Sequence, residues 1–168
     1  MLRQFIMLSK GQKNKEMIQE RFKLTPAVCV LLQKGDNILL LKRQNTGYKD
    51  GTYGFPGGSV DGDETILQAA IREAYEEVGV VIKEKDLDVI HVVHERYSDD
   101  PKVRYQGEAI VFLVRAYQWI GDPQIMEPNK CSEIKWCELE NLPEETMDAA
   151  HHFFYQVKEN KFYSEFGW

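Results

Sequence analysis

The stretch GSVDGDETILQAAIREAYEEVGV, residues 58–80, carries the most regular pattern in the chain. Between residues 64 and 79, apolar side chains recur at helical spacing, which predicts a helix with one buried face. That face consists of Leu67, Ala70, Ile71, Ala74 and Val78. Thr65, three residues before Gln68, offers an N-terminal cap, and Gly79 offers a C-terminal stop. The stretch therefore predicts a helix packed on a larger core.

The same stretch concentrates the negative charge of the chain. Residues 57–80 hold six acidic residues and one arginine, whereas the whole chain has a net charge of −6. Glu73, Glu76 and Glu77 share one side of the predicted helix, beside its apolar face, so their carboxylates repel one another. A divalent cation that prefers oxygen ligands, Mg²⁺ or Mn²⁺, would offset this repulsion. The alternative is a solvated acidic face in which Arg72 pairs with Glu76.

The spacing of these residues resembles the Nudix box. The matching positions are Gly58, Glu64, Arg72, Glu73, Ala74, Glu76, Glu77, Gly79 and Val80. Ala74 is smaller than the aliphatic residue that the family more often has there. The preceding run Phe55-Pro56-Gly57-Gly58 looks like the turn that leads into the box. The resemblance implies an enzyme that hydrolyses a pyrophosphate bond in a nucleoside diphosphate derivative, with Mg²⁺ as cofactor and Mn²⁺ as a substitute.

The resemblance also implies roles for single residues. The implied metal ligands are the backbone carbonyl of Gly57 and the carboxylates of Glu73, Glu76 and Glu77. Glu73 and Glu76 are the candidate catalytic carboxylates, and family members differ in which glutamate acts as general base. Glu64 and Arg72 are expected to form the catalytic-site pair that holds the loop to the helix.

Apolar runs outside the box predict the remaining elements. We expect strands at 26–33, 37–43, 87–97 and 108–119 and a second helix at 144–158. Residues 34–37 have the composition of a hairpin turn. Because the strands are apolar on successive positions, helices should cover both faces of the sheet. The expected fold is α/β (α+β), and the resemblance implies the Nudix-type α/β/α sandwich with a mixed β-sheet between helices.

Length and composition limit the domain organisation and the partners. The 168 residues fit one domain, and we expect a flexible or surface-docked extension at 1–21 before a single Nudix hydrolase domain at 22–168. Twenty-one basic and 27 acidic residues, without a basic block, argue against nucleic-acid polymers as partners. No apolar run approaches the roughly 20 residues that span a bilayer, so no membrane partner is expected. Three cysteines without a disulfide framework predict a cytoplasmic location. The sequence does not decide the oligomeric state, and a homodimer is one alternative.

A small-molecule nucleotide needs cations for its phosphates and apolar surface for its base. Lys42 and Arg43, at the end of a predicted strand, are the candidate phosphate contacts, with strand-end solubility as the alternative. Tyr53 and Phe55 are candidates for stacking on the base, with a role in the core as the alternative. Glu108, at the start of another predicted strand, is a candidate extra ligand or base.

The substrate is predicted from regions outside the box. Residues 127–143 look like the C-terminal region of MutT-like nucleoside-triphosphate pyrophosphohydrolases, which favours a normal or damaged nucleoside triphosphate cut to the monophosphate and pyrophosphate. Glu95 and Arg96 stand where family members that cut ADP-ribose often have a proline. Tyr97 stands where dinucleoside-polyphosphate hydrolases often have a tyrosine. Those two classes, nucleotide-sugar hydrolysis and a non-catalytic nucleotide-sensing module are the alternatives.

Overall fold

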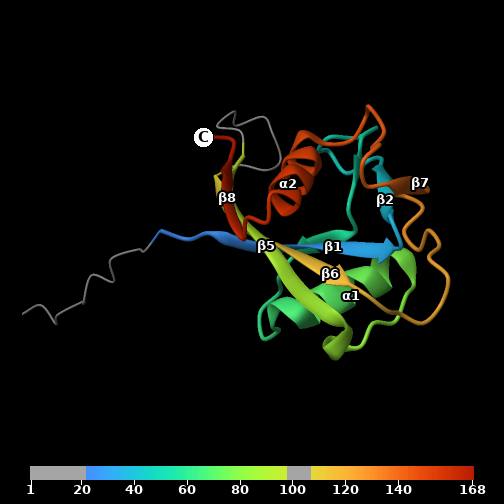
Figure 1. Cartoon of the computed structure of the whole chain (residues 1–168). Helices are drawn as coiled ribbons and strands as arrows, with labels where there is room; N and C mark the ends of the chain where they lie inside the picture. The colour runs from blue at the N-terminus through green and yellow to red at the C-terminus, as the bar shows by residue number, and fades with distance from the viewer. Residues whose placement is uncertain (1–21, 98–106) are drawn as a thin grey trace, which may run out of the picture.

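The computed structural model describes residues 22–97 and 107–168, so the extension expected at 1–21 lies outside the described residues. The elements follow one another along the chain as Figure 1 shows: β1 Thr25–Lys34, β2 Asn37–Arg43, β3 Tyr53–Gly54, β4 Gly57–Ser59, α1 Ile66–Val78, the 3₁₀ turn Glu84–Asp86, β5 Leu87–Arg96, β6 Glu108–Ala116, β7 Cys131–Glu138, α2 Asp148–Lys158 and β8 Tyr163–Phe166.

The strands form one mixed sheet. Its hydrogen-bonded order is β3-β2-β1-β6-β5-β8, with β4 paired to β1 and β7 paired to β2. β1 runs parallel to β6, and β5 runs parallel to β8. The β1–β2, β5–β6 and β2–β7 pairs are antiparallel. The hairpin expected at 34–37 is confirmed, because Lys34 and Asn37 face each other across the turn.

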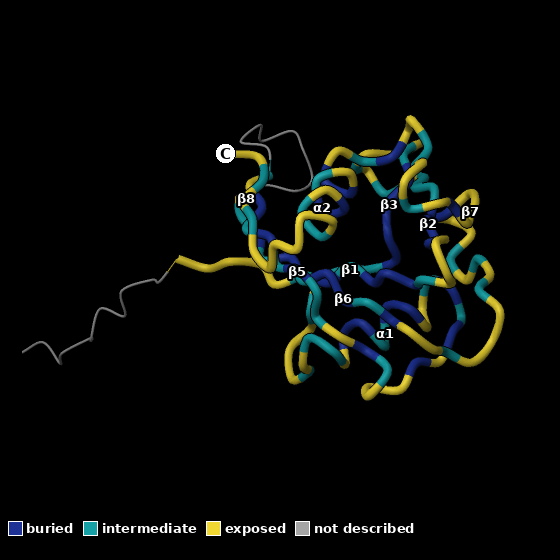
Figure 2. The backbone as a smooth tube through the Cα atoms, viewed as in Figure 1, coloured by how far each residue is buried: buried dark blue, intermediate teal, exposed yellow. Residues whose placement is uncertain are grey.

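The two helices cover opposite faces of the central strands, with α1 below and α2 above in Figure 1. Leu31 of β1 packs in the hydrophobic cluster that contains Phe153 of α2. Its neighbours Val30 and Leu32 pack in the cluster that contains Ala74 of α1. The successive residues Val30, Leu31 and Leu32 of β1 are therefore buried on both sides. Figure 2 shows β1 in teal and dark blue between the two helices. This confirms the expected mixed sheet between helices.

Several boundaries differ from the prediction. α2 begins at Asp148 instead of 144, because the preceding segment bonds elsewhere: the amide of Thr146 donates to the carbonyl of Pro143, and the amide of Met147 donates to that of Tyr53. The strands β3, β4, β7 and β8 were not predicted. β3 and β4 are too short, at two and three residues, for their alternation to show in the sequence.

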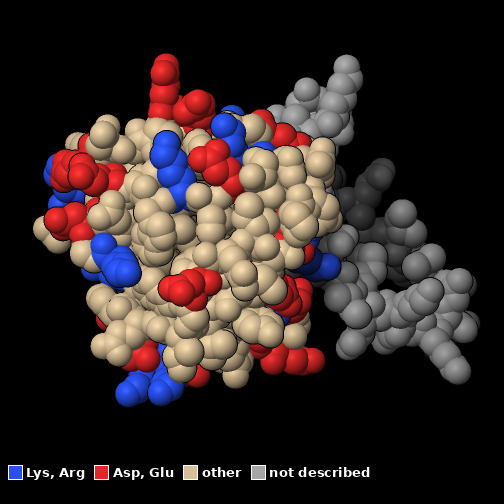
Figure 3. All heavy atoms as spheres, turned by 90° about the vertical axis from the view of Figure 1, so that its right-hand side faces the viewer, with Lys and Arg blue, Asp and Glu red and all other residues tan. Residues whose placement is uncertain are grey.

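The surface charges agree with the composition. On the face shown in Figure 3, acidic and basic side chains are scattered among neutral ones, and the blue atoms form no continuous stripe. Within residues 22–97 and 107–168, no helix combines the length and the apolar character that crossing a bilayer requires.

Candidate active site

The two ends of α1 are fixed by the residues that the sequence singled out. The hydroxyl of Thr65 accepts a hydrogen bond from the amide of Gln68, and the side chain of Gln68 accepts one from the amide of Thr65. This capping box satisfies amides at the helix start that would otherwise lack partners. Gly79 ends the helix in the left-handed conformation, with φ of 71°. The carboxylates of α1 are therefore presented from a helix with defined ends.

Arg72 joins the loop before α1 to the helix. Its Nε and Nη2 donate to the two oxygens of Glu64, at 3.1 and 2.7 Å. Nη2 also donates to the carbonyl of Ser59 at 3.1 Å. Hydrogen bonds from Arg72, and one from the amide of Asp61, lower the pKa of Glu64, which therefore stays ionised. Glu64 and Arg72 thus lie together as expected of an orienting pair.

The three glutamates of the box lie in different environments. Glu73 is buried, and its Oε1 accepts from Nη1 of Arg72 at 2.7 Å. Glu76 is half-exposed and accepts from the same nitrogen at 3.2 Å. Glu77 accepts from the amide of Gly57 at 2.9 Å. Burial raises the pKa of Glu73 despite its bonds to Arg72, and burial raises the pKa of Glu77 to about 7. Desolvation and mutual repulsion thus oppose ionisation here.

Two glycines allow β4 to lie close to these carboxylates. A Cβ atom at Gly58 would lie 2.5 Å from Oε1 of Glu73. A Cβ atom at Gly57 would collide with the carbonyl oxygen of Val28 on β1, and Gly57 has a φ of 152°. A side chain at Gly57 would therefore push β4 away from the backbone of β1, whereas one at Gly58 would displace the carboxylate of Glu73. The close approach of β1, β4 and α1 thus favours glycine at both positions.

These residues border one cavity of about 290 Å³, which we call the acidic cavity. It is lined by Leu41, Lys42, Arg43, Asn45, Thr46, Gly57, Gly58, Glu73, Glu76, Glu77, Glu127, Lys130 and Cys131. Glu127 and Lys130 come from the loop before β7 and pair with each other at 2.7 Å. Neither residue was predicted from the sequence as part of the site, although both lie in the segment 127–143, which looks like the C-terminal region of MutT-like enzymes. Carboxylates and cations thus meet in the same cavity.

The donor set of the acidic cavity fits a hard divalent cation. In the described part of the chain, no three acidic, histidine or cysteine side chains converge on one point as a metal centre. Arg72 instead bridges Glu73 and Glu76. Yet four glutamates line one cavity, and two of them have raised pKa values because they are poorly solvated. Carboxylate oxygens of this kind suit Mg²⁺ or Mn²⁺, which would compete with Arg72 for its partners.

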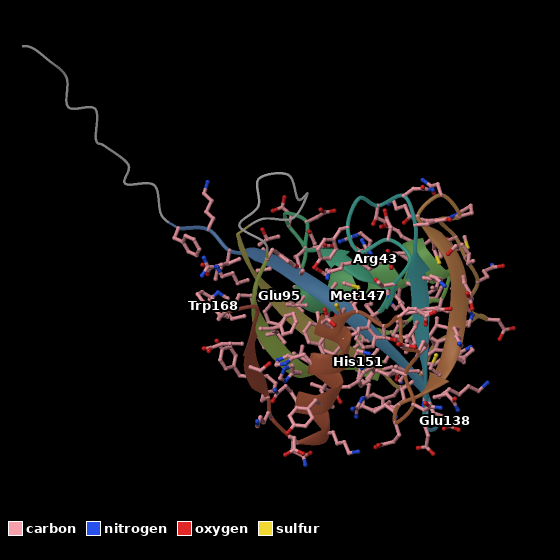
Figure 4. The ribbon with its side chains drawn as sticks, turned by 90° about the horizontal axis from the view of Figure 1, so that it is seen from above. Arg43, Glu95, Glu138, Met147, His151 and Trp168 are labelled. Carbon is pink, nitrogen blue, oxygen red and sulfur yellow. The ribbon has the colours of Figure 1, made fainter. Side chains whose placement is uncertain are left out.

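A second cavity of about 140 Å³, which we call the aromatic cavity, adjoins the first. Both are lined by Arg43, Gly57 and Gly58. The walls of the aromatic cavity are largely apolar and come from β1, β4, β5, β6, α2 and nearby loops: they include Tyr48, Phe55, Tyr97, Val111, Met147 and Phe153. Figure 4 shows Arg43 and Met147 near the middle of the molecule, Glu95 between Met147 and Trp168, and Glu138 at a distant edge. Glu95 is a charged residue in this lining that the sequence reasoning did not assign to a site.

The structure brings some candidate substrate residues to the cavities and leaves others away. Lys42 and Arg43 line the acidic cavity, and Phe55 lines the aromatic cavity. Tyr53 lines neither, because it is 4% exposed in the core beneath α2, with Lys42 Nζ 5.0 Å from its ring centroid. Glu108 also lines neither, because its carboxylate pairs with Nε2 of His94 at 2.8 Å on the neighbouring strand. The structure therefore does not bring Tyr53 and Glu108 to either cavity, and their roles at the site stay predictions.

Comparison with known proteins identifies relatives of most of this chain. The model of the NUDIX domain family matches residues 23–157. An ADP-ribose pyrophosphatase from Methanocaldococcus jannaschii is 33% identical over 138 residues, which cover 81% of this chain and 76% of that protein. The NAD-capped RNA hydrolase NudC from Escherichia coli O157:H7 is 27% identical over 127 residues, or 74% of this chain. The chain spans only 44% of the length of NudC.

A solved structure supports the same grouping. The MutT NUDIX hydrolase from Burkholderia pseudomallei superposes with a TM-score of 0.70 and 25% identity, covering 81% of this chain and 99% of that one. The mixed sheet, the two helices and the box residues around the acidic cavity agree with these matches. The family match over residues 23–157 and the relative with one-third identity show that this chain belongs to the Nudix hydrolases and is a pyrophosphohydrolase.

Proposed function

We propose that this protein uses Mg²⁺ to hydrolyse a pyrophosphate bond in a small nucleoside diphosphate derivative. The observation that carries the proposal is the pair of adjoining cavities. One is lined by four glutamates and three basic residues, and the other by apolar and aromatic side chains. A substrate that has phosphates at one end and a flat base at the other matches this division.

Gly57, Glu73, Glu76 and Glu77 would hold the metal, and Mn²⁺ would substitute for Mg²⁺. When bound, such an ion neutralises phosphate charge and lowers the pKa of a bound water. The chain's own residues have separate tasks. Arg43 lines both cavities, and we propose that it contacts the phosphates between them. Glu64 fixes Arg72, which in turn positions Glu73 and Glu76. Glu73 and Glu76 remain our candidate catalytic carboxylates.

ADP-ribose is the substrate that the comparisons favour. The relative with 33% identity is named an ADP-ribose pyrophosphatase, and the match covers most of both proteins. The sequence prediction had placed ADP-ribose behind the nucleoside triphosphates because Glu95 and Arg96 replace a frequent proline. Similarity over 138 residues is broader support than one position. We therefore propose ADP-ribose, cut to AMP and ribose 5-phosphate, as the first substrate to test.

A nucleoside triphosphate is the second candidate. Lys130, from the segment that resembles MutT-like enzymes, lines the acidic cavity together with Lys42 and Arg43. Three basic residues around one cavity suit the additional phosphate of a triphosphate. Cleavage would then give the monophosphate and pyrophosphate.

The test is a comparison of substrates at saturating Mg²⁺. The panel contains ADP-ribose, the common nucleoside triphosphates, oxidised triphosphates and diadenosine polyphosphates, and kcat/KM is measured for each. We expect ADP-ribose to exceed every other compound by at least about tenfold, which is roughly 1.4 kcal/mol of transition-state preference. If the kcat/KM of a triphosphate exceeds that of ADP-ribose by the same factor, the second candidate is the substrate. Hydrolysis of no compound on the panel would refute the proposed function.

A further inference from the structure

Glu95 is buried, and its carboxylate has no partner among the described residues. It lies on β5 and is 6% exposed. Among the described residues, no hydrogen bond or ion pair reaches its side chain, whereas the neighbouring His94 bonds Glu108. Burial raises the pKa of Glu95 to about 7. An unpaired buried carboxyl costs free energy, and an apolar residue of similar size would stabilise the fold more. The fold alone therefore gives no reason for a glutamate at this position.

This carboxylate borders the aromatic cavity. Glu95 lines it together with Phe55, Met147 and Phe153, and Figure 4 shows Glu95 and Met147 on neighbouring elements. A third cavity of about 390 Å³, lined in part by Tyr97, also reaches Glu95. Glu95 thus lies between two cavities. A bound molecule could reach its carboxylate even though little of the side chain faces solvent.

The surroundings select the kind of group that Glu95 can bind. Glu95 does not line the acidic cavity, so it is not among the residues around the proposed metal and phosphates. A second negative group would be repelled, whereas an N–H donor would satisfy the carboxylate. The neighbouring aromatic and apolar walls suit the flat face of a nucleobase better than a sugar, whose hydroxyls would lack partners on Phe55 or Phe153. The complementary group is therefore an amino group on the edge of a base.

We propose that Glu95 accepts a hydrogen bond from the exocyclic amino group of a purine base in the aromatic cavity, and that it thereby selects adenine or guanine substrates. This inference rests on the proposed function only in that the ligand is a nucleotide. Glu95 would act in substrate selection, because it lines the aromatic cavity and not the acidic cavity where the phosphates would react.

Binding of nucleoside monophosphates tests this without any turnover. Isothermal titration calorimetry on the full chain compares AMP with purine riboside 5′-monophosphate, and GMP with IMP. Each second compound differs from the first by loss of the amino group. We expect removal of the amino group to weaken binding at least about tenfold in one of the two pairs, since a buried carboxylate is then left unpaired. The pair that responds identifies the base. Equal binding within both pairs, or no binding at millimolar concentration, would overturn the inference.

Three variants separate selection from other roles of Glu95. Glu95→Leu lacks any acceptor and should reduce the preference to less than about twofold. Glu95→Gln keeps an acceptor oxygen in the same place and should retain it. Glu138→Leu makes the same change at an exposed position on β7 and should bind like the wild type. Thermal unfolding confirms that each variant is folded. If Glu95→Leu keeps the full preference for the amino-bearing monophosphate, the proposal is overturned. It is also overturned if kcat of Glu95→Gln for the best substrate of the panel falls 100-fold, because Glu95 would then act in the reaction itself.

The two proposals fail differently. If the wild type hydrolyses no compound on the substrate panel but prefers the amino-bearing monophosphate, the proposed function fails and the role of Glu95 stands. If it hydrolyses ADP-ribose but binds both members of each pair equally, the role of Glu95 fails and the proposed function stands.

Discussion

At the scale of single residues, one arginine in the site forms hydrogen bonds with several carboxylates but not with all of them. Arg72 donates to Glu64, Glu73 and Glu76, while Glu77 has only the amide of Gly57 as its hydrogen-bond donor among the described residues. The pKa of Glu64 is lowered and that of Glu77 is raised, so carboxylates of one short stretch differ in charge near neutral pH. The local partner, more than the residue type, decides what each carboxylate can do.

Glu77→Gln should reduce activity without unfolding the protein. The amide oxygen still accepts from Gly57, but the negative charge proposed to hold the metal is lost. We expect kcat to fall by about 10² or more, the scale of losing a charge that stabilises the transition state. The melting temperature of the metal-free protein should stay or rise, since repulsion with Glu73 is relieved. Steady-state kinetics and thermal unfolding measure both. The control is Glu138→Gln. A near-wild-type kcat in Glu77→Gln would instead support the alternative that Glu77 belongs to a solvated acidic face.

Glu95 makes the stability of the metal-free protein depend on pH. The pKa of Glu95 is raised from 4.5 to about 7 in the folded state, so the folded chain keeps a proton that the unfolded chain has lost between these values. The free energy of unfolding therefore falls as pH rises through this range, and the decrease from Glu95 ends above about pH 7. The contribution is on the order of 3 kcal/mol as an upper bound.

Glu95→Leu should remove this share of the pH dependence. Urea unfolding at about pH 5 and about pH 8, in the presence of EDTA, gives the difference for the wild type and the variant. Because Glu77 contributes in the same direction, the variant should retain a smaller slope than the wild type. An identical slope in both proteins would show that Glu95 does not titrate in this way.

At the scale of elements, the sequence predicted those that depend on local patterns, but it did not predict strand pairs between distant parts of the chain. The helix expected at 64–79 is α1 at Ile66–Val78, because its apolar spacing and both caps lie within one stretch. The β1–β2 hairpin is likewise local. β7 pairs with β2 from a distant part of the chain, and β8 pairs in parallel with β5. Partners so far apart leave no periodic signal that a single sequence reveals.

The close packing of β4 on α1 predicts a strong effect at Gly58. In Gly58→Ala, the added methyl carbon would lie 2.5 Å from Oε1 of Glu73 and must displace that carboxylate. We expect kcat/KM to fall at least about tenfold, because displacement of a catalytic group by a fraction of an ångström is costly.

Gly62→Ala is the matched control for this variant. A Cβ placed at Gly62, in the loop before α1, would meet no described atom within 4 Å apart from those of its chain neighbours. Its kcat/KM should stay within about twofold of the wild-type value, since surface changes are usually small. Equal activity of the two alanine variants would show that the approach of β4 to Glu73 does not matter for catalysis.

At the scale of the whole molecule, the fold joins residues that are far apart in sequence around two cavities. The sequence predicted Gly57, Glu73, Glu76, Glu77, Lys42, Arg43 and Phe55 at the site, and each of them lines one of the cavities. Glu64 and Arg72 lie beside the acidic cavity, because Arg72 bonds Glu73 and Glu76. The sequence did not predict Glu95, Glu127, Lys130 or Phe153, which reach the cavities only through sheet order and the position of α2. It also predicted Tyr53 and Glu108, which line neither cavity, because nothing local distinguishes a core tyrosine or a paired glutamate from a ligand. A homodimer, a cytoplasmic location and the 22–168 domain limits stay predictions.

The central claim is that the acidic cavity works through a divalent cation, and one measurement tests it most directly. The wild-type protein is stripped with EDTA and incubated with ADP-ribose, or with the best substrate of the panel, and the products are separated by chromatography. We expect no AMP or ribose 5-phosphate until Mg²⁺ or Mn²⁺ is added in excess, since the glutamates alone would repel the phosphates. The full rate of product formation in EDTA would contradict the account.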